Sequence, residues 1–158
     1  MRKILLLIFT VGSLITLNAK STQVEKTLDA YIAAWNAHNI KKIETFYDND
    51  VRWYDLGYDY TTEGKAAVGK AITDAFMGNV DDMYWGKSGD LFVSGDTVIY
   101  EWVYGGTFNG LFDGVPVKNR KFEIKGISTT TINSKGKITS QKDYYDLFSF
   151  KKQLGLLP

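Results

Sequence analysis

The second half of the chain reads almost entirely as strands and turns, and it follows a first half that reads mainly as helices. In a strand, successive side chains point to opposite faces, so alternation of apolar and polar residues predicts a strand. The stretch TVIYEWVYGGTF, residues 97–108, puts Val98, Tyr100, Trp102 and Tyr104 on one face. Helices followed by a run of antiparallel strands predict an α+β fold.

Four more segments of this half are predicted strands: MYWGK (residues 83–87), LFVS (91–94), RKFEIKGISTTTI (120–132) and GKITSQKDYYDL (136–147). The connection between the last two has the length of a hairpin turn. Asn109-Gly110 and Asp113-Gly114 predict turns, or together one loop. The paired glycines Gly105-Gly106 lie inside a strand and favour a bend there. A strongly bent sheet can wrap around a helix and leave a conical cavity.

The first half contains three predicted helices. Thr22 and Glu25 have the spacing of a capping box, and the apolar residues that follow recur at helical spacing to about residue 38. Asn39 is expected to cap a short second helix. A third helix is expected from residue 63 or 64 to residue 77, where a glycine follows.

The first residues have the pattern of a secretory signal peptide. Two basic residues precede an apolar run over residues 4–17, and Ala19 stands at a plausible cleavage position. The run is short for a membrane-spanning helix, which needs about 20 residues. We therefore expect residues 1–19 to be removed, residues 20–158 to form one domain, and the protein to be periplasmic or secreted. No cysteine follows the run, which argues against a lipid anchor.

The charge and the reactive side chains limit the function classes. Without Arg2 and Lys3 the 19 basic residues become 17, against 18 acidic ones. This balance argues against a nucleic-acid or anionic-membrane partner. The chain has no cysteine and one histidine, His38, so neither disulfides nor a transition-metal site is expected, and no cofactor is predicted.

The stretch GKITSQKDYYDLFSF, residues 136–150, carries two acids around a Tyr-Tyr pair, and each acid has more than one interpretation. Asp143 is either a charge on a solvated edge strand or an acid that faces a pocket. If it faces a pocket, strand alternation places Gln141 and Tyr145 on the same face. Asp146 has the opposite parity and is expected to be structural.

A second acid, Asp55, stands out in the alternating segment NDVRWYDLG, residues 49–57. The alternation puts it on the same face as Val51 and Trp53. One interpretation is that it pairs with a lysine or caps a loop amide. The other is that it shares a cavity with Asp143, where burial and like charge raise carboxyl pKa values. An acid and a base in one pocket is an arrangement used for proton transfer.

The order of elements and several segments resemble one known family. AYIAAWNAHNIKKIETFYDNDVRWYD (residues 30–55), GTFNGLFDGVPVKNRKFEIKGIS (106–128) and the tail GKITSQKDYYDLFSF with QLGLLP are similar to the SnoaL-like branch of the NTF2-like superfamily. The resemblance covers nearly the whole predicted domain. It implies a cone of strongly bent antiparallel sheet wrapped around N-terminal helices, with an internal pocket and dimerisation through the sheet.

The resemblance also implies roles for particular residues. The family's acid/base aspartate falls on Asp143. In the limonene-epoxide-hydrolase type, an arginine bridges two aspartates. Here the position of that arginine holds Trp102, and the position of the second aspartate holds Tyr104. The positions of a helping tyrosine and asparagine hold Trp53 and Asp55. The charged bridge of that hydrolysis is therefore missing. The polyketide-cyclase type asks for a pocket and one carboxylate, which Asp143 alone supplies.

These considerations give two main functional interpretations. In the first, Asp143 transfers a proton in an enzyme (a cyclase, isomerase or hydrolase) that acts on a small apolar carbonyl or cyclic compound, and Asp55 and Tyr104 orient the substrate. In the second, the same pocket only binds a small apolar ligand. A structural module that dimerises through its sheet is a third interpretation. The expected pocket walls, which could equally be plain core, are Trp35, Trp53, Tyr100, Trp102, Gln141 and Tyr145.

Overall fold

The structure is a computed structural model that describes residues 23–157, in which one six-stranded sheet has the order β2-β1-β6-β5-β4-β3. All neighbouring strands are antiparallel except β1 and β6. The α+β fold predicted from the order of helices and strands is confirmed. The strands are β1 (Tyr47–Asp55), β2 (Tyr60–Glu63), β3 (Tyr84–Ser94), β4 (Thr97–Phe112), β5 (Val115–Ile132) and β6 (Ile138–Tyr145).

The helices pack on the concave side and at the edges of the sheet. The first helix covers residues 23–36 and buries its apolar stripe, including Leu28 and Tyr31. It is followed by α2 (Ile40–Glu44), α3 (Lys65–Ala71) and, at the C-terminus, α4 (Leu147–Gln153). The predicted signal peptide and the Thr22 cap lie outside the described residues. Within the described range, no helix is long and apolar enough to cross a membrane.

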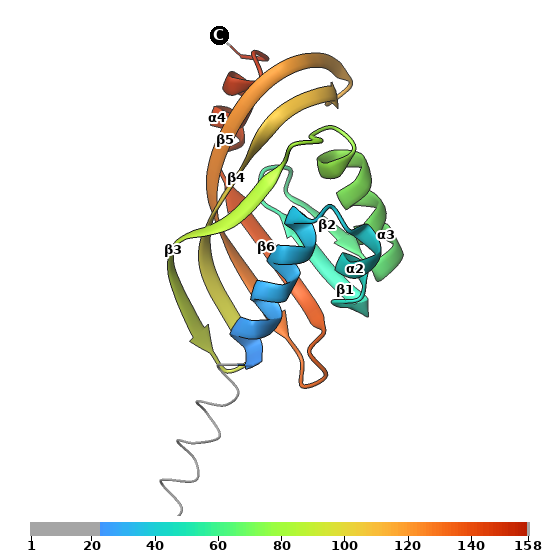
Figure 1. Ribbon diagram of the computed structural model, residues 1–158, viewed down its shortest axis with the longest axis vertical. Coiled ribbons are helices and arrows are strands. Elements are labelled where there is room, and N and C mark those ends of the chain that lie inside the picture. The colour runs from blue at the N-terminus through green and yellow to red at the C-terminus, as the bar shows by residue number, and fades with distance from the viewer. Residues whose placement is uncertain (1–22, 158) are drawn as a thin grey trace, which may run out of the picture.

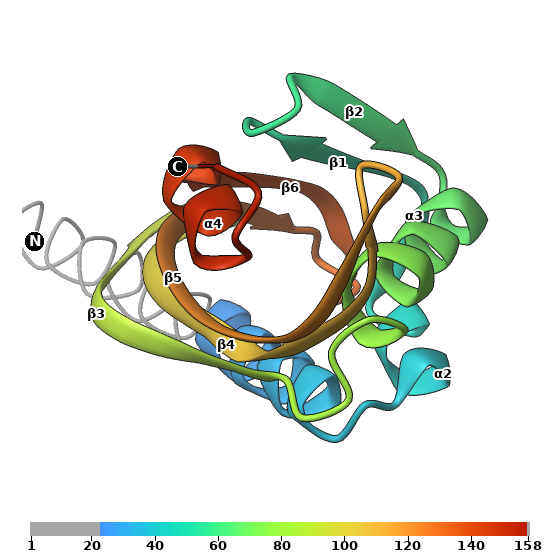
Figure 2. The same ribbon diagram turned by 90° about the horizontal axis from the view of Figure 1, so that it is seen from above.

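The sheet is strongly curved, and its longest strands produce the curvature. Figure 1 shows β4 and β5 arching together over the rest of the molecule, and Figure 2 shows the arch curling around α4, with β1 and β6 opposite. Strand β3 pairs with β4 only as far as Gly105, and beyond it β4 pairs with β5 alone. Gly106 has φ of +152°, and a Cβ there would lie 2.5 Å from Val80 Cγ1. The bend predicted at Gly105-Gly106 is therefore tied to close packing that only glycine permits.

Tertiary pairing changes several predicted boundaries. The two short strands predicted at 83–87 and 91–94 form one strand, β3, with a register shift between Lys87 and Leu91. Asn109-Gly110 is not a turn: β4 continues through it because β5 supplies a partner strand, and the chain reverses at Asp113-Gly114. Strand β2 was not predicted, and its only strand partner among the described residues is β1.

Aromatic and aliphatic side chains on the concave face form a single core. The inward-facing residues of β4 that the alternation predicted, from Val98 to Tyr104, are all buried. Trp85 of β3 connects this face to the first helix. Its ring packs against Tyr100 of β4 and edge-on against both Tyr31 and Trp35. Full burial of a large apolar side chain contributes roughly 1.5–3 kcal/mol, so this core is the main source of stability in a protein without disulfides.

Candidate active site

A small internal cavity lies between the curved sheet and the helices, with a volume of about 60 Å³. All four tryptophans of the chain line this cavity, which we call the inner cavity. Its lining consists of Trp35, Trp53, Asp55, Phe76, Trp85, Trp102, Tyr104, Ile124, Gln141, Asp143, Tyr145 and Phe150.

The Asp143 carboxyl group lies at the inner cavity and accepts hydrogen bonds from three side chains. Trp53 Nε1 donates to Oδ2 at 2.5 Å, and Ser128 Oγ donates to Oδ1. Gln141 Nε2 lies 3.1 Å from Oδ1 and 3.2 Å from Oδ2. Asp143 itself is 9 % exposed. These donors come from β1, β5 and β6, so the sheet fixes the orientation of the carboxyl group.

A second row of contacts holds Ser128 in place. Trp102 Nε1 donates to Ser128 Oγ at 2.8 Å, so the hydroxyl proton of Ser128 is directed to Asp143. Trp102 pairs with Gly126 across β4 and β5, and its indole ring lies over that glycine. A Cβ at residue 126 would lie 2.6 Å from Trp102 Cη2. Glycine at this position is thus what lets the indole reach Ser128.

Burial controls the acidity of Asp143. Removal from water raises the pKa of its carboxyl group to about 6, although the hydrogen bonds from Ser128, Trp53 and Gln141 act in the opposite direction. Charge repulsion from Asp55 adds a smaller upward contribution. A carboxyl group with a pKa near 6 can both accept and release a proton close to neutral pH, which is what general acid–base catalysis requires.

Asp55 lies where the inner cavity meets a larger outer cavity of about 540 Å³. Tyr145 Oη donates to Asp55 Oδ2 at 3.1 Å, and burial raises the pKa of the Asp55 carboxyl group. Burial also raises the pKa of the Tyr145 hydroxyl, so it stays protonated. The outer cavity is lined by Trp53, Asp55, Tyr58, Tyr60, Thr62, Ala71, Ala75, Phe76, Phe108, Leu111, Phe112, Asp113, Tyr145 and Phe150.

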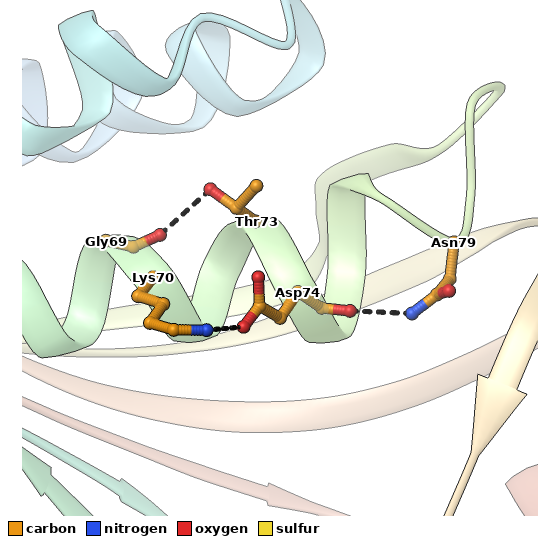
Figure 3. Close-up of polar contacts among 5 residues, drawn as sticks. All are labelled: Gly69, Lys70, Thr73, Asp74 and Asn79. Carbon is orange, nitrogen blue, oxygen red and sulfur yellow. Dashed lines mark hydrogen bonds and ion pairs between the residues drawn. The ribbon is translucent and has the colours of Figure 1, made fainter. Parts of the chain in front are cut away.

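A π-helical turn places Phe76 between the two cavities. Helix α3 continues without a break into the π-helix η1 (Ile72–Met77), a geometry that is often found at functional sites. Figure 3 shows the polar contacts of this turn: Thr73 donates to the Gly69 carbonyl and Asn79 Nδ2 donates to the Asp74 carbonyl. The Phe76 ring lies 5.5 Å from that of Trp53 and 5.9 Å from that of Tyr104, measured between centroids.

Two residues of the inner lining have buried polar atoms without a hydrogen-bond partner among the described residues: Trp35 at Nε1 and Gln141 at Oε1. Unpaired buried polar atoms are uncommon, and each costs roughly 1–3 kcal/mol. One is a donor and the other is an acceptor. No group of three or more His, Asp or Glu residues within residues 23–157 could hold a metal ion.

Comparison with known proteins agrees with this architecture. The model of the SnoaL-like polyketide cyclase family matches residues 25–154. The chain belongs to the SnoaL-like polyketide cyclase family. Among the curated proteins, none matches this SnoaL-like protein significantly.

Several solved structures have the same fold. A SnoaL-like protein from Shewanella denitrificans OS-217 is 21% identical with a TM-score of 0.74, over 84% of this chain and 96% of that one. A protein from Catenulispora acidiphila DSM 44928 with a ketosteroid isomerase-like fold, in complex with trimethylamine, is 28% identical with a TM-score of 0.66, over 84% and 93%. TerC, co-crystallised with polyporic acid, is 16% identical with a TM-score of 0.67, over 84% and 98%.

Eight of the nine site residues expected from the sequence line the inner cavity of this SnoaL-like protein. The exception is Tyr100, which was expected in the pocket wall and lies in the core instead. It is 1% exposed and packs 6.2 Å from the Trp85 ring, measured between centroids. Although Tyr100 shares a strand face with Trp102, Trp85 covers it, because β3 and the first helix close that end of the cone.

Several residues of the site were not predicted from the sequence. Ser128 contacts Asp143 directly, but it lies in a polar run, STTT, that gives no sign of a buried hydroxyl. Trp85 and Phe76 were placed in a short strand and a helix, and their spacing alone did not point to a cavity. Phe150 closes the lining from α4. A search for aromatic residues on the inward face of every element would have found Trp85 and Phe76.

Proposed function

We propose that the protein is an acid–base enzyme for a small, largely apolar carbonyl or cyclic compound, with Asp143 as the group that accepts and returns a proton. The observation that carries this proposal is a buried, oriented carboxyl group with a pKa raised to about 6 at the wall of an aromatic cavity. Proton transfer of this kind contributes typically 10²- to 10⁴-fold to the rate. Membership of the polyketide cyclase family supports the same reaction class.

Neighbouring side chains can stabilise the negative charge that such a proton transfer creates. When Asp143 removes a proton from a carbon next to a carbonyl group, negative charge develops on the carbonyl oxygen. Tyr145 and Tyr104 line the same cavity, and burial raises the pKa of both hydroxyls, so they are protonated donors. The Tyr145 proton is already donated to Asp55, so Tyr104 is the hydroxyl that we assign to stabilising the enolate oxygen, and Asp55 with Tyr145 positions the substrate.

The proposal is tested with purified protein and a panel of small cyclic ketones, hydroxyquinones and epoxides. Conversion of one compound class by the parent protein, followed by chromatography of the products, supports the enzyme. Two fold neighbours were solved with small molecules of different chemistry, one in complex with trimethylamine and one co-crystallised with polyporic acid. The panel therefore includes both an amine series and a quinone series.

A second function, binding without chemistry, is favoured by one specific observation. Both oxygens of Asp143 already accept hydrogen bonds from protein donors, so a substrate proton must compete with Trp53, Ser128 and Gln141. Recovery of a tightly bound ligand in unchanged form, with no turnover of any panel compound, would support this second function and contradict the first.

We also propose that the protein is exported, because residues 1–19 have the pattern of a signal peptide. Expression of the full chain in a Gram-negative host is expected to give periplasmic protein that begins at Lys20 or within about two residues of it. N-terminal sequencing checks this expectation. Protein that stays in the cytoplasm with its first residues intact would contradict export.

Dimerisation through the outer face of the sheet is a further part of the proposal. Phe92 is 63% exposed and pairs with Ile99, and Ile127 lies diagonally across on β5, which makes an apolar patch. The parent protein is expected to be a dimer in light scattering, and Phe92→Glu a monomer. Phe148→Glu, a change of an equally exposed phenylalanine on α4, is the control that should remain dimeric. A monomeric parent protein at micromolar concentration would contradict this model.

A further inference from the structure

The two cavities contain carboxyl groups but no fixed positive charge. Asp143, Asp55 and Asp113 belong to the linings, whereas no lysine, arginine or histidine does. Within residues 23–157, neither Asp143 nor Asp55 forms an ion pair. A carboxylate held away from water without a cationic partner is costly, so a ligand that brings a positive charge gains this uncompensated attraction.

Aromatic rings form most of the remaining wall. Eight of the twelve residues that line the inner cavity are tryptophan, tyrosine or phenylalanine. The face of an aromatic ring attracts a cation, with tryptophan the strongest, and the attraction grows when water is excluded. A neutral apolar ligand would use only the hydrophobic surface of these rings. A substituted ammonium group would use both their surface and their charge distribution.

The protein's own lysine illustrates this chemistry at the mouth of the outer cavity. Lys151 Nζ lies 2.9 Å from Asp113 Oδ2, 6.0 Å from the centroid of the Tyr58 ring and 5.8 Å from that of the Phe112 ring. Tyr58, Phe112 and Asp113 are all lining residues of the outer cavity. One ammonium group is therefore already held there by rings and a carboxylate, the same combination that the deeper part of the site offers.

We propose that the ligand of this site carries a substituted ammonium group, which is recognised at the boundary of the two cavities by Asp55 and the ring of Phe76. Asp55 lines both cavities. Its carboxyl group accepts from Tyr145 Oη on Oδ2, from the Tyr58 N–H, 3.4 Å away, on Oδ1, and from the Gly57 N–H. Asp55 is partly exposed whereas Asp143 is buried, so Asp55 is the more accessible of the two carboxyl groups.

The division of roles follows from these contacts. Asp55 holds the positive charge, and Asp143 keeps the proton-transfer role. The inner cavity of about 60 Å³ suits a group of a few heavy atoms, and the outer cavity of about 540 Å³ takes the remainder of the molecule. This inference rests on the proposed function for the role of Asp143, but recognition of the cation does not depend on turnover.

The test uses intrinsic fluorescence, because every tryptophan of the chain lines the inner cavity and reports on it. Choline is titrated against 3,3-dimethylbutan-1-ol, its neutral counterpart of the same shape, and protonated dimethylaminoethanol adds an N–H. We expect the two cations to bind at least tenfold more tightly than the neutral alcohol. Equal affinity for choline and the alcohol, or no response to any cation at 10 mM, would overturn the inference.

Two variants and a control locate the cation. Asp55→Asn is expected to weaken choline binding at least tenfold while leaving the weak affinity for the neutral alcohol within twofold. Phe76→Leu, which keeps an apolar side chain but removes the ring, is expected to weaken choline binding about fivefold. Asp90→Asn makes the same charge change on an exposed part of β3 and should have no effect. Loss of choline binding in the control, or full binding in Asp55→Asn, would contradict the assignment.

The outcomes separate this inference from the proposed function. Cation binding without turnover of any compound would leave the inference intact and remove the enzyme. Turnover of neutral carbonyl compounds with no preference for cations would support the enzyme and contradict the inference. A melting temperature for each variant within a few degrees of the parent value shows that altered binding does not arise from unfolding.

Discussion

Asp143→Asn is expected to lower kcat/KM by 10²- to 10⁴-fold for whichever compound the parent protein converts. The asparagine side chain has nearly the same shape, but it cannot accept or return a proton at neutral pH. The loss therefore matches the typical contribution of a general acid–base group. Ligand affinity should change far less, because the cavity walls remain, so the loss should appear mainly in kcat.

The same segment provides a control for this experiment. Asp146 is three residues away, points out of the cavity and caps α4 by accepting from Ser149 N at 3.0 Å. Asparagine is an equally good N-cap residue, so Asp146→Asn should keep both the fold and the activity. Steady-state kinetics and circular dichroism of the parent and both variants check the prediction. Equal turnover by Asp143→Asn and the parent protein would remove Asp143 from the chemistry.

The free energy of unfolding is expected to fall by roughly 2 kcal/mol between pH 4 and pH 7 because of Asp143 alone. Burial raises the pKa of this carboxyl group from 3.8 to about 6 in the folded protein. The folded state therefore holds the proton at pH values where the unfolded chain has released it. This contribution to stability is complete below about pH 4 and is lost as the pH rises through about 6.

Other carboxyl groups also titrate in this range, so the contribution of Asp143 is isolated by comparison with Asp143→Asn. Urea unfolding at pH 4 and at pH 7 gives the difference in stability between the parent protein and the variant at each pH. That difference should move by roughly 2 kcal/mol against the parent protein as the pH rises from 4 to 7. A difference that does not change with pH would mean that folding does not raise the pKa of Asp143, and it would weaken the acid–base proposal.

Local patterns were sufficient for most of the fold. Alternation placed the inward faces of β1, β4 and β6 correctly, and helical spacing placed the buried stripe that includes Leu28 and Tyr31. The boundaries that were wrong depend on a partner strand. The Asn-Gly pair at 109–110 stays in β4 because β5 pairs with β4 both before it, at Phe108, and from Gly110 onward. Strand β2 has β1 as its strand partner.

The candidate site was only partly visible in the sequence. Alternation showed that Gln141, Asp143 and Tyr145 share a face, but it gave no information on what lies opposite. The partners of the carboxyl group are 90 residues away in Trp53 and 15 residues away in Ser128. Their contacts depend on the parallel pairing of β1 with β6 and on the register of β5, neither of which a local pattern encodes.

The sequence by itself determined the order of helices and strands and which side chains each element turns inward, because these follow from periods of 3.6 and 2 residues along a single segment. Only the tertiary structure decided that four distant tryptophans line one cavity, and that the carboxyl groups of Asp143 and Asp55 reach it without a balancing positive charge. Curvature and strand register set these distances, and the resulting loss of water is what shifts the acidity of Asp143.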